Sequence, residues 1–231
     1  THFSNLDSAI IGFGMDYIGM PAFQYGAGLN LFNSRFFSFF MGNLGAYKLD
    51  RRKKNPIYLE TLKSFSNTNI LAGAHTIFFP GGTRSRAGNI ETDLKLGLLG
   101  TVLKAQRIHH ERNPSNLAPK IFIVPLTLSY HFVLESSSLI EDQLKRTGKE
   151  KYLVYDAPPT SGKGIWKFFW DTFSKSTDIT LSLSEPMDVF GNPLDDNGNS
   201  LDKFGHPIDI RQYFVNKGEM KPDEQREMIY T

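Results

Sequence analysis

Between residues 45 and 130, short β-rich runs alternate with longer runs of helical spacing, and this alternation constrains the fold more than any other feature. The strongest strand signal is the run 120–130. Pro125 interrupts that run, so we expect it at an edge, a bulge or a strand end. Shorter strands are expected from residue 45 and over 75–79. Strands that alternate with helices predict an α/β fold with a mixed, largely parallel central sheet flanked by helices.

The expected helices differ in how they meet the core. The first is predicted to be buried on nearly all sides and to end at Pro21. The helix that begins at Pro56, a favoured first-turn position for proline, is predicted to turn Tyr58, Leu59, Leu62 and Phe65 toward the core. The other expected elements are helices over 30–41, 94–110, 136–145 and 209–217, a strand over 178–184 and a surface loop over 192–207.

Length and composition restrict the classes of protein that remain. The chain has 231 residues, of which 40% are hydrophobic, and it shows no evident internal repeat, so we expect one domain over residues 1–231. The net charge of +2 gives no argument for a nucleic-acid partner. Because there is no cysteine, disulfides, thiolate metal sites and cysteine nucleophiles are excluded.

No apolar run is long enough to predict a transmembrane helix, and no signal peptide is found. The chain opens on Thr1 and His2 without a methionine. We therefore expect that an N-terminal part, with room for a membrane anchor, precedes Thr1.

Three stretches have a composition that suits a lipid surface, and each has a plainer alternative. Residues 30–41 are rich in phenylalanine, and residues 162–175 combine aromatic side chains with lysines. Either stretch also suits an ordinary core helix. The cations at 51–54 follow a strand and form either a solvated face or an anion-binding loop.

His2 and Asp7 lie five positions apart, directly before the first expected helix. A carboxylate in the first turn of that helix complements the helix dipole and can hydrogen-bond one ring nitrogen of the histidine. The other ring nitrogen can then remove a proton from a substrate hydroxyl. A lone His and Asp at this spacing is a weak signal, so the pair needs support from the rest of the chain.

A glycine turn with two arginines follows the expected strand over 75–79. Gly81 and Gly82 let the backbone approach a ligand and expose its N–H groups. Arg84 and Arg86 can hold phosphate oxygens with planar, bidentate geometry. The alternative is a tight turn with two solvated arginines. No Gly-Lys-Ser/Thr follows, so the P-loop pattern and nucleoside triphosphate hydrolysis are disfavoured.

Together these blocks resemble the motifs of the glycerolipid acyltransferases, which include the glycerol-3-phosphate and lysophosphatidate acyltransferases. Four blocks match in order over residues 2–130, and an ordered set is far more specific than any single block. They are His2 to Asp7 (HxxxxD), Gly45 to Arg51 (a strand that ends in Asp-Arg), Phe79 to Arg86 (FPEGTRS-like), and Val124-Pro125 with Tyr130 beyond.

The resemblance implies transfer of a fatty acyl group from acyl-CoA or acyl-carrier protein, the co-substrate, with no further cofactor and no metal. His2 would be the general base and Asp7 its orienting acid, without a covalent enzyme intermediate. The substrate phosphate would be held by Arg51, Gly82, Thr83, Arg84, Ser85 and Arg86. The implied setting is phospholipid synthesis at the cytoplasmic face of a membrane, peripheral or anchored by a preceding N-terminal segment.

The sequence departs from the family pattern at Gly81, where many members carry Glu. Gly-Gly followed by Arg-x-Arg resembles the glycerol-3-phosphate branch, so this acceptor is favoured and the role of that Glu is in doubt. Lysophosphatidate is the alternative acceptor. A non-catalytic peripheral membrane-binding module is a further alternative, although such a module has no use for His2 and Asp7.

Overall fold

The computed structural model describes residues 7–32, 38–39, 42–50, 52–81, 94–113, 118–130, 144, 179–216 and 219–220. The chain divides into two compact units. The first contains residues 1–14, 79–94 and 127–182, and the second contains residues 15–78, 95–126 and 183–231. The expectation of one domain over residues 1–231 stays a prediction.

Helix α1 (Asp7–Tyr17) confirms the first predicted helix but is buried on one side only. Asp7, Ile11 and Met15 are 2%, 1% and 3% exposed and repeat every four residues, whereas Phe13 and Tyr17 are 75% and 84% exposed. The prediction of burial on nearly all sides is therefore wrong, because the run carries one buried stripe at helical spacing.

The end of α1 is set by Gly19 and not by Pro21. Gly19 has φ +79°. Its N–H donates to the Asp16 carbonyl at 2.9 Å, and the Met20 N–H donates to the Met15 carbonyl, also at 2.9 Å. These two bonds form a Schellman cap, in which a left-handed residue ends the helix.

Parallel pairing occurs in the second unit, where β1 (Tyr25–Gly28) pairs with β2 (Ala46–Leu49) in parallel. Just before β1, Gln24 donates its N–H to the His75 carbonyl and accepts from the Ile77 N–H, which is a parallel bridge to Thr76. The predicted strand over 75–79 is reduced to this bridge. Within the described residues each sheet has two strands, so the large, largely parallel central sheet is not confirmed.

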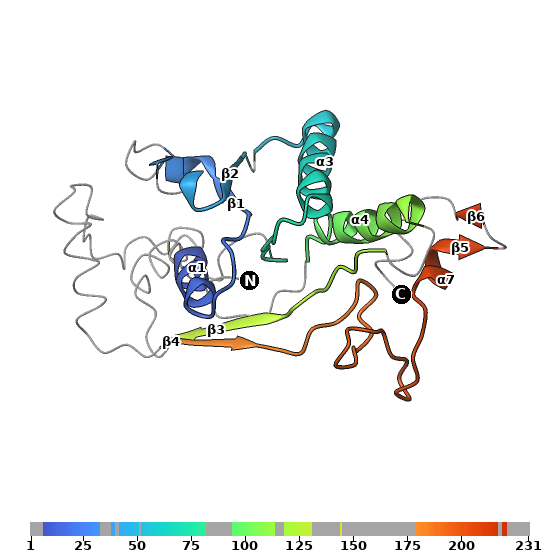
Figure 1. Cartoon of the computed structure of the whole chain (residues 1–231). Coiled ribbons are helices and arrows are strands. Elements are labelled where there is room, and N and C mark those ends of the chain that lie inside the picture. Colours follow the sequence, from blue (N-terminus) through green and yellow to red (C-terminus); the bar gives the residue numbers. More distant parts are fainter. Residues whose placement is uncertain are drawn as a thin grey trace. The chain divides into compact units, whose positions relative to one another are not determined.

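A second two-stranded sheet joins β3 (Leu126–Tyr130) and β4 (Ile179–Leu183), which run in opposite directions (Figure 1). Pro125 directly precedes β3, as expected at a strand end, and its carbonyl accepts from the Ser184 N–H at 2.9 Å. In the first unit, Leu181 lies so close to Gly14 that a β-carbon there would be 2.7 Å from its Cδ2 atom. Gly14 therefore allows α1 to pack tightly on β4.

Helices α3 (Pro56–Leu71) and α4 (Leu99–Arg112) pack together through polar groups. The Ser66 hydroxyl lies 3.0 Å from the Thr101 hydroxyl, and the Asn67 amide donates to the Thr101 carbonyl at 3.1 Å. Ser66, Asn67 and Thr101 are all buried. The predicted apolar stripe is wrong in part, since Leu59 and Phe65 are 41% and 45% exposed.

The hydrophobic core of the second unit lies where α4 meets α7 (Arg211–Phe214). Leu103, Val189 and Phe214 are buried there together. Gln106, which is wholly buried, ties α4 to the neighbouring segment: its Oε1 accepts from the Ile121 N–H at 2.8 Å and its Nε2 donates to the Pro119 carbonyl at 3.0 Å. The chain then continues as an antiparallel pair, β5 (Val215–Asn216) and β6 (Glu219–Met220).

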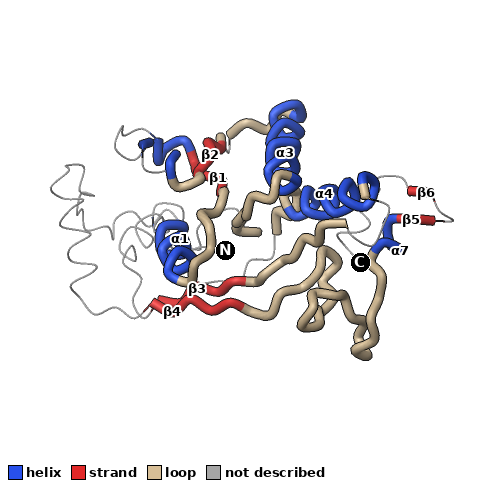
Figure 2. The backbone as a smooth tube through the Cα atoms, in the orientation of Figure 1, coloured by secondary structure: helices blue, strands red, loops and turns tan. Residues whose placement is uncertain are grey.

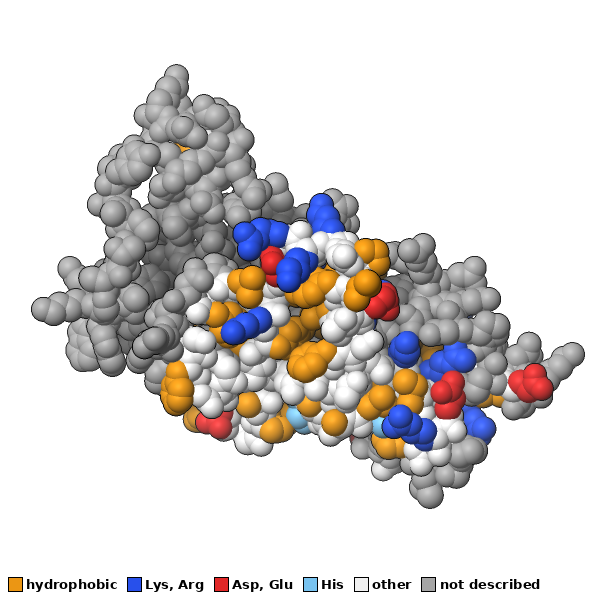
Figure 3. Space-filling view, turned by 90° about the horizontal axis from the view of Figure 1, so that it is seen from above, with side chains coloured by type: hydrophobic (Ala, Val, Ile, Leu, Met, Phe, Trp, Pro, Cys, Tyr) orange, Lys and Arg blue, Asp and Glu red, His pale blue; other side chains and the backbone are white. Residues whose placement is uncertain are grey.

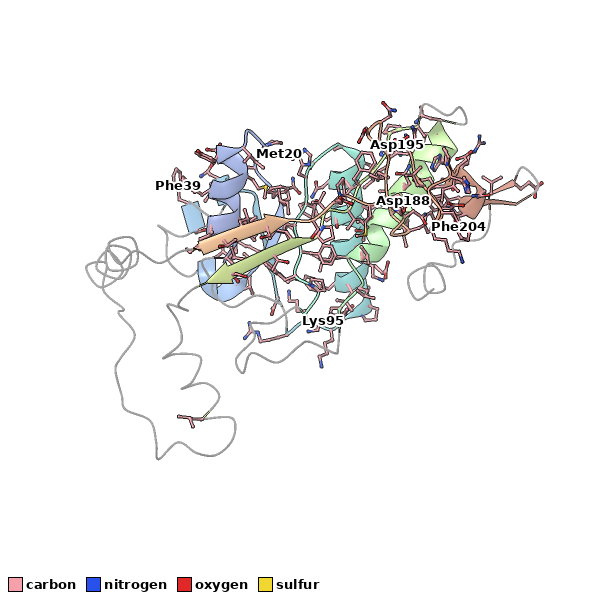
Figure 4. The ribbon with its side chains drawn as sticks, turned by 90° about the horizontal axis from the view of Figure 1, so that it is seen from below. Met20, Phe39, Lys95, Asp188, Asp195 and Phe204 are labelled. Atoms are coloured by element: carbon pink, nitrogen blue, oxygen red, sulfur yellow. The ribbon has the colours of Figure 1, made fainter. Side chains whose placement is uncertain are left out.

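The expectation of no internal repeat is wrong, because residues 188–208 contain a seven-residue unit three times. Each unit reads Asp-x-x-Gly-Asn/His-Pro/Ser-Leu/Ile and begins at Asp188, Asp195 or Asp202. Figure 2 draws most of this segment as loop, and Figure 4 labels Asp188 and Asp195 in it. We call residues 188–208 the turn repeat.

Each unit of the turn repeat is closed by its own aspartate. The carboxylate accepts from the backbone N–H groups two and four positions later, at 2.7 to 2.9 Å. The glycine of each unit has φ between +71° and +86°, which few other residues adopt. Successive units are also linked, since the N–H groups of Leu201 and Ile208 donate to the carbonyls of Pro193 and Ser200 at 2.8 Å.

Two other sequence expectations meet the structure only in part. The expected helix over 30–41 begins as a short 3-10 helix, η1 (Leu29–Phe32), and most of its other residues lie outside the described residues. Helix α4 begins at Leu99 rather than at residue 94. The aromatic segment 162–175 and most of the expected helix over 136–145 also lie outside the described residues.

Candidate active site

Asp7 is the first residue of α1, and its side chain is buried beside Ile11 and Met15. A carboxylate in the first turn is stabilised by the positive end of the helix dipole. Burial of a charged group costs free energy unless the group is paired or hydrogen-bonded. A buried carboxylate at this position therefore indicates a specific role for Asp7. The predicted partner His2 lies outside the described residues, and the pairing stays a prediction.

The glycine turn begins within the described residues and then leaves them. Gly81 is buried at the start of a turn, whereas the predicted phosphate ligands Gly82, Thr83, Arg84, Ser85 and Arg86 lie outside. Asp7 and Gly81 belong to the same compact unit. Asp7 is the one predicted site residue within the described residues, so the grouping of the site stays a prediction.

The Asp-Arg block follows β2, as predicted. The Asp50 N–H donates to the Tyr58 hydroxyl at 2.9 Å. The Asp50 carboxylate accepts from the N–H and Nε of Arg52 at 3.1 and 3.3 Å, and these bonds, the backbone one first, lower the pKa of Asp50. The Arg52 side chain is 87% exposed. Arg51 lies outside the described residues.

Two of the predicted blocks directly follow segments that pair in parallel with the chain around β1. Asp50 follows the carboxyl end of β2, and Pro80 follows the run that bridges Gln24. Both segments run parallel to the chain around β1. The anion-binding role of the loops that follow these two segments stays a prediction.

The fourth block lies at the junction of the 120–125 segment and β3. Ile123 exchanges two backbone hydrogen bonds with Met187, at 2.8 and 2.9 Å. Val124 is 47% exposed, and Pro125 directly precedes β3. This block thus has a structural reason for its sequence, because proline ends the bridge segment and begins the strand.

The part of the chain that the structure describes contains no group of three or more His, Cys, Asp or Glu side chains arranged to bind a metal ion. The expectation that no metal takes part stays a prediction. Among those same residues, no helix has the length and apolar character needed to cross a membrane.

Sequence reasoning missed the buried polar set Ser66, Asn67 and Thr101. The sequence holds no clear signal for it, because Ser66 and Asn67 are buried through partners that α4 supplies more than 30 residues later. Sequence reasoning also missed the turn repeat, which a search for aspartate–glycine spacing would have found.

A comparison with protein families gives one match. The family model described as Acyltransferase matches residues 1–129, which is more than half of the chain. The matched range contains the first three predicted blocks and Val124-Pro125 of the fourth. No curated protein matches the chain significantly.

Proposed function

Because the chain belongs to the acyltransferase family, we propose that it transfers a fatty acyl group from an acyl thioester to the hydroxyl of glycerol-3-phosphate. The observation that carries the proposal is the family match over residues 1–129, which includes the His2–Asp7 block and the glycine turn. The burial of Asp7 at the start of α1 supports it, since an orienting carboxylate needs a fixed position.

In the proposed reaction, the free ring nitrogen of His2 takes the proton from the glycerol hydroxyl as its oxygen attacks the thioester carbon. Asp7 orients the ring and stabilises the imidazolium. The tetrahedral intermediate collapses, the carbon–sulfur bond breaks, and the imidazolium returns the proton to the departing thiolate. The products are the acyl ester and a free thiol, and no metal or covalent acyl-enzyme takes part.

We propose that Arg84 and Arg86 bind the phosphate of the acceptor, with help from Arg51 and the backbone of Gly82, Thr83 and Ser85. Guanidinium groups match phosphate oxygens in a planar, bidentate manner, which positions the hydroxyl for attack. The acyl donor is acyl-CoA or acyl-carrier protein. The product is a lipid, and we propose that the enzyme works at a membrane surface.

The catalytic pair is tested by His2→Ala and Asp7→Asn, with Asp196→Asn as a matched control at an exposed position. Loss of a general base costs about 10²- to 10⁴-fold in rate, so His2→Ala is expected to lose at least 99% of the thiol release from acyl-CoA with glycerol-3-phosphate. Asp7→Asn is expected to be strongly impaired, and the control to match the wild type.

Circular dichroism of each variant separates lost chemistry from lost folding. A folded His2→Ala variant that keeps more than about a tenth of the wild-type rate would remove His2 from the role of general base.

A further inference from the structure

The two most buried side chains of α3 are polar, and part of its exposed side is apolar. Ser66 and Asn67 are 3% and 8% exposed, whereas Ile57 and Phe65 are 77% and 45% exposed. A buried polar residue or an exposed large apolar residue is informative where an ordinary surface leucine is not. Phe65 packs edge-on against the Tyr47 ring at 5.3 Å and stays partly exposed, whereas Ile57 is largely exposed to solvent.

We define the α3 outer face as the exposed residues Ile57, Thr61, Ser64, Phe65 and Thr68. Their spacing of four, three, one and three residues places them along one side of the helix. The hydroxyls of Thr61 and Thr68 donate to the carbonyls of Ile57 and Ser64 at 2.8 and 2.9 Å. Because these hydroxyls are bonded within the helix, removing this face from water leaves few donors without a partner.

A cationic segment leads into this face. Arg52, Lys53 and Lys54 are exposed and immediately precede the helix cap at Asn55. Cations near the beginning of a helix are unfavourable, since that end carries the positive pole of the dipole. Arg52 pairs with Asp50, and Lys53 lies over the Tyr58 ring at 5.5 Å, but all three cations stay exposed to solvent.

The charge is concentrated here and not spread over the chain. Residues 48–68 contain six cations and two carboxylates, a net charge of +4, whereas the whole chain has a net charge of +2. The other residues together therefore carry a net charge of −2. Both carboxylates in the segment accept from cations of the same segment: Asp50 from Arg52 at 3.3 Å, and Glu60 from Lys63 at 2.8 Å.

Figure 3 looks down on the end of α3 that is uppermost in Figure 1, where the helix begins. On this face, Lys and Arg side chains lie next to hydrophobic ones. Two more apolar residues of the same unit are exposed, Phe39 at 67% and Leu44 at 50%.

We propose that the α3 outer face and the cations Arg52, Lys53 and Lys54 form a docking surface for an anionic phospholipid membrane. Cations attract the negative headgroups, and the apolar side chains enter the boundary between headgroups and acyl chains. The proposal rests on the proposed function, because the lipid product of that reaction is the reason to expect a membrane near the enzyme. It assigns to α3 a role separate from catalysis.

The test is co-sedimentation of the chain with vesicles of phosphatidylcholine, with and without about 30% phosphatidylglycerol, a composition that supplies negative surface charge. The wild type is expected to bind the anionic vesicles and to be released by about 0.5 M salt, which screens the surface charge. The triple variant Arg52→Glu, Lys53→Glu, Lys54→Glu is expected to bind roughly 100-fold more weakly, and Ile57→Glu roughly 10-fold more weakly. Arg51 is left intact because the proposed site uses it.

The matched control is Lys203→Glu, which changes an exposed cation beside the exposed Phe204, at the other end of the same unit's sequence. This control is expected to bind vesicles like the wild type. Thermal unfolding of each variant checks that all are folded, which is expected because every changed residue is exposed.

Acyl transfer with a water-soluble donor and no vesicles separates this proposal from the proposed function. If the triple variant loses vesicle binding but keeps normal acyl transfer, the docking proposal is supported. If the wild type shows no acyl transfer but the triple variant still loses vesicle binding, the docking proposal stands and the proposed function fails. The docking proposal is overturned if the triple variant binds anionic vesicles like the wild type, or if the wild type binds neutral vesicles equally well. It is also overturned if the triple variant keeps its affinity for anionic vesicles and loses its affinity for acyl-carrier protein, because the surface would then bind a protein and not a membrane.

Discussion

The turn repeat and the α3–α4 pair both enclose polar side chains, but they fix them in different ways. In the turn repeat, each aspartate bonds backbone groups within the next four residues. In the helix pair, Ser66 and Asn67 bond Thr101 across 34 or 35 residues of sequence. Local bonding follows from local sequence, whereas the helix pair depends on which side of each helix meets the other.

The largest loss in the free energy of unfolding should come from a change at Asp188, the buried aspartate of the turn repeat. Its carboxylate accepts from the Phe190 N–H, the Asn192 N–H and the Asn192 side chain, at 2.8, 2.9 and 2.9 Å. Asp188→Ala leaves these donors without a partner next to the core, and we expect a loss of about 3 kcal/mol in the free energy of unfolding. Asp196→Ala, at an exposed position of the same repeat, should change it by less than about 0.5 kcal/mol.

Urea unfolding of both variants measures this contrast. Equal destabilisation by the two changes would mean that the carboxylate of Asp188 does not hold its turn, and the comparison with the helix pair would lose its basis.

A single substitution in the helix pair should lower the free energy of unfolding by less, because the Asn67 amide keeps its bond to the Thr101 carbonyl when the hydroxyl is removed. Thr101→Val removes a hydroxyl that lies 3.0 Å from the Ser66 hydroxyl and donates to the Leu98 carbonyl at 2.6 Å. We expect a loss of about 1.5 kcal/mol in the free energy of unfolding. Ile57→Ala on the α3 outer face should cost less than about 0.5 kcal/mol, since surface substitutions seldom cost more.

Thermal or urea unfolding of this pair of variants tests whether α3 is polar inside and apolar outside. A larger loss from Ile57→Ala than from Thr101→Val would show that the outer face is covered within the folded chain, which contradicts the docking proposal as well.

The smallest expected effect is a local response of the turn repeat to acid. Backbone N–H groups of Asn199 and His206 hold the pKa values of Asp195 and Asp202 below their ordinary value of 3.8. A carboxyl whose pKa is lowered by folding adds stability that is present above pH 3.8 and is lost as pH falls through the folded pKa. The second and third turns should therefore open more readily below pH 3.8.

Amide hydrogen exchange at Asn197, Asn199, Phe204 and His206 measures this opening. After correction for the intrinsic exchange rate, protection at these amides should decrease as the pH is lowered from about 4. Amides of α4, such as that of Ala105, serve as the reference. Unchanged protection over that range would mean that the two carboxylates do not hold their turns.

Some elements could be predicted because their signals are local. Pro56 and the cap at Asn55 place the start of α3, and Pro125 places the start of β3. Asp7 in the first turn of α1 was also predictable, since a carboxylate there complements the helix dipole.

Other features depend on contacts that a single sequence does not display. The inner side of α3 carries Ser66 and Asn67 because Thr101 offers them partners, and hydrophobic spacing alone turned Leu59 and Phe65 inward instead. The end of α1 was placed at Pro21 because proline is an obvious stop, although Gly19 can adopt the left-handed cap that ends the helix earlier. The roles of His2, Arg51, Arg84 and Arg86 stay predictions.

The central claim is that this acyltransferase acts on glycerol-3-phosphate, and the most direct measurement is a competition between two acceptors. The chain is given acyl-CoA with equal concentrations of glycerol-3-phosphate and a lysophosphatidate whose acyl chain differs in length from that of the acyl-CoA, and the acylated products are separated and identified by mass. We predict that the main product is a glycerol phosphate that carries only the acyl chain of the donor, and that this product is absent with His2→Ala. A diacylated product alone, or no His2-dependent product from either acceptor, would contradict the claim.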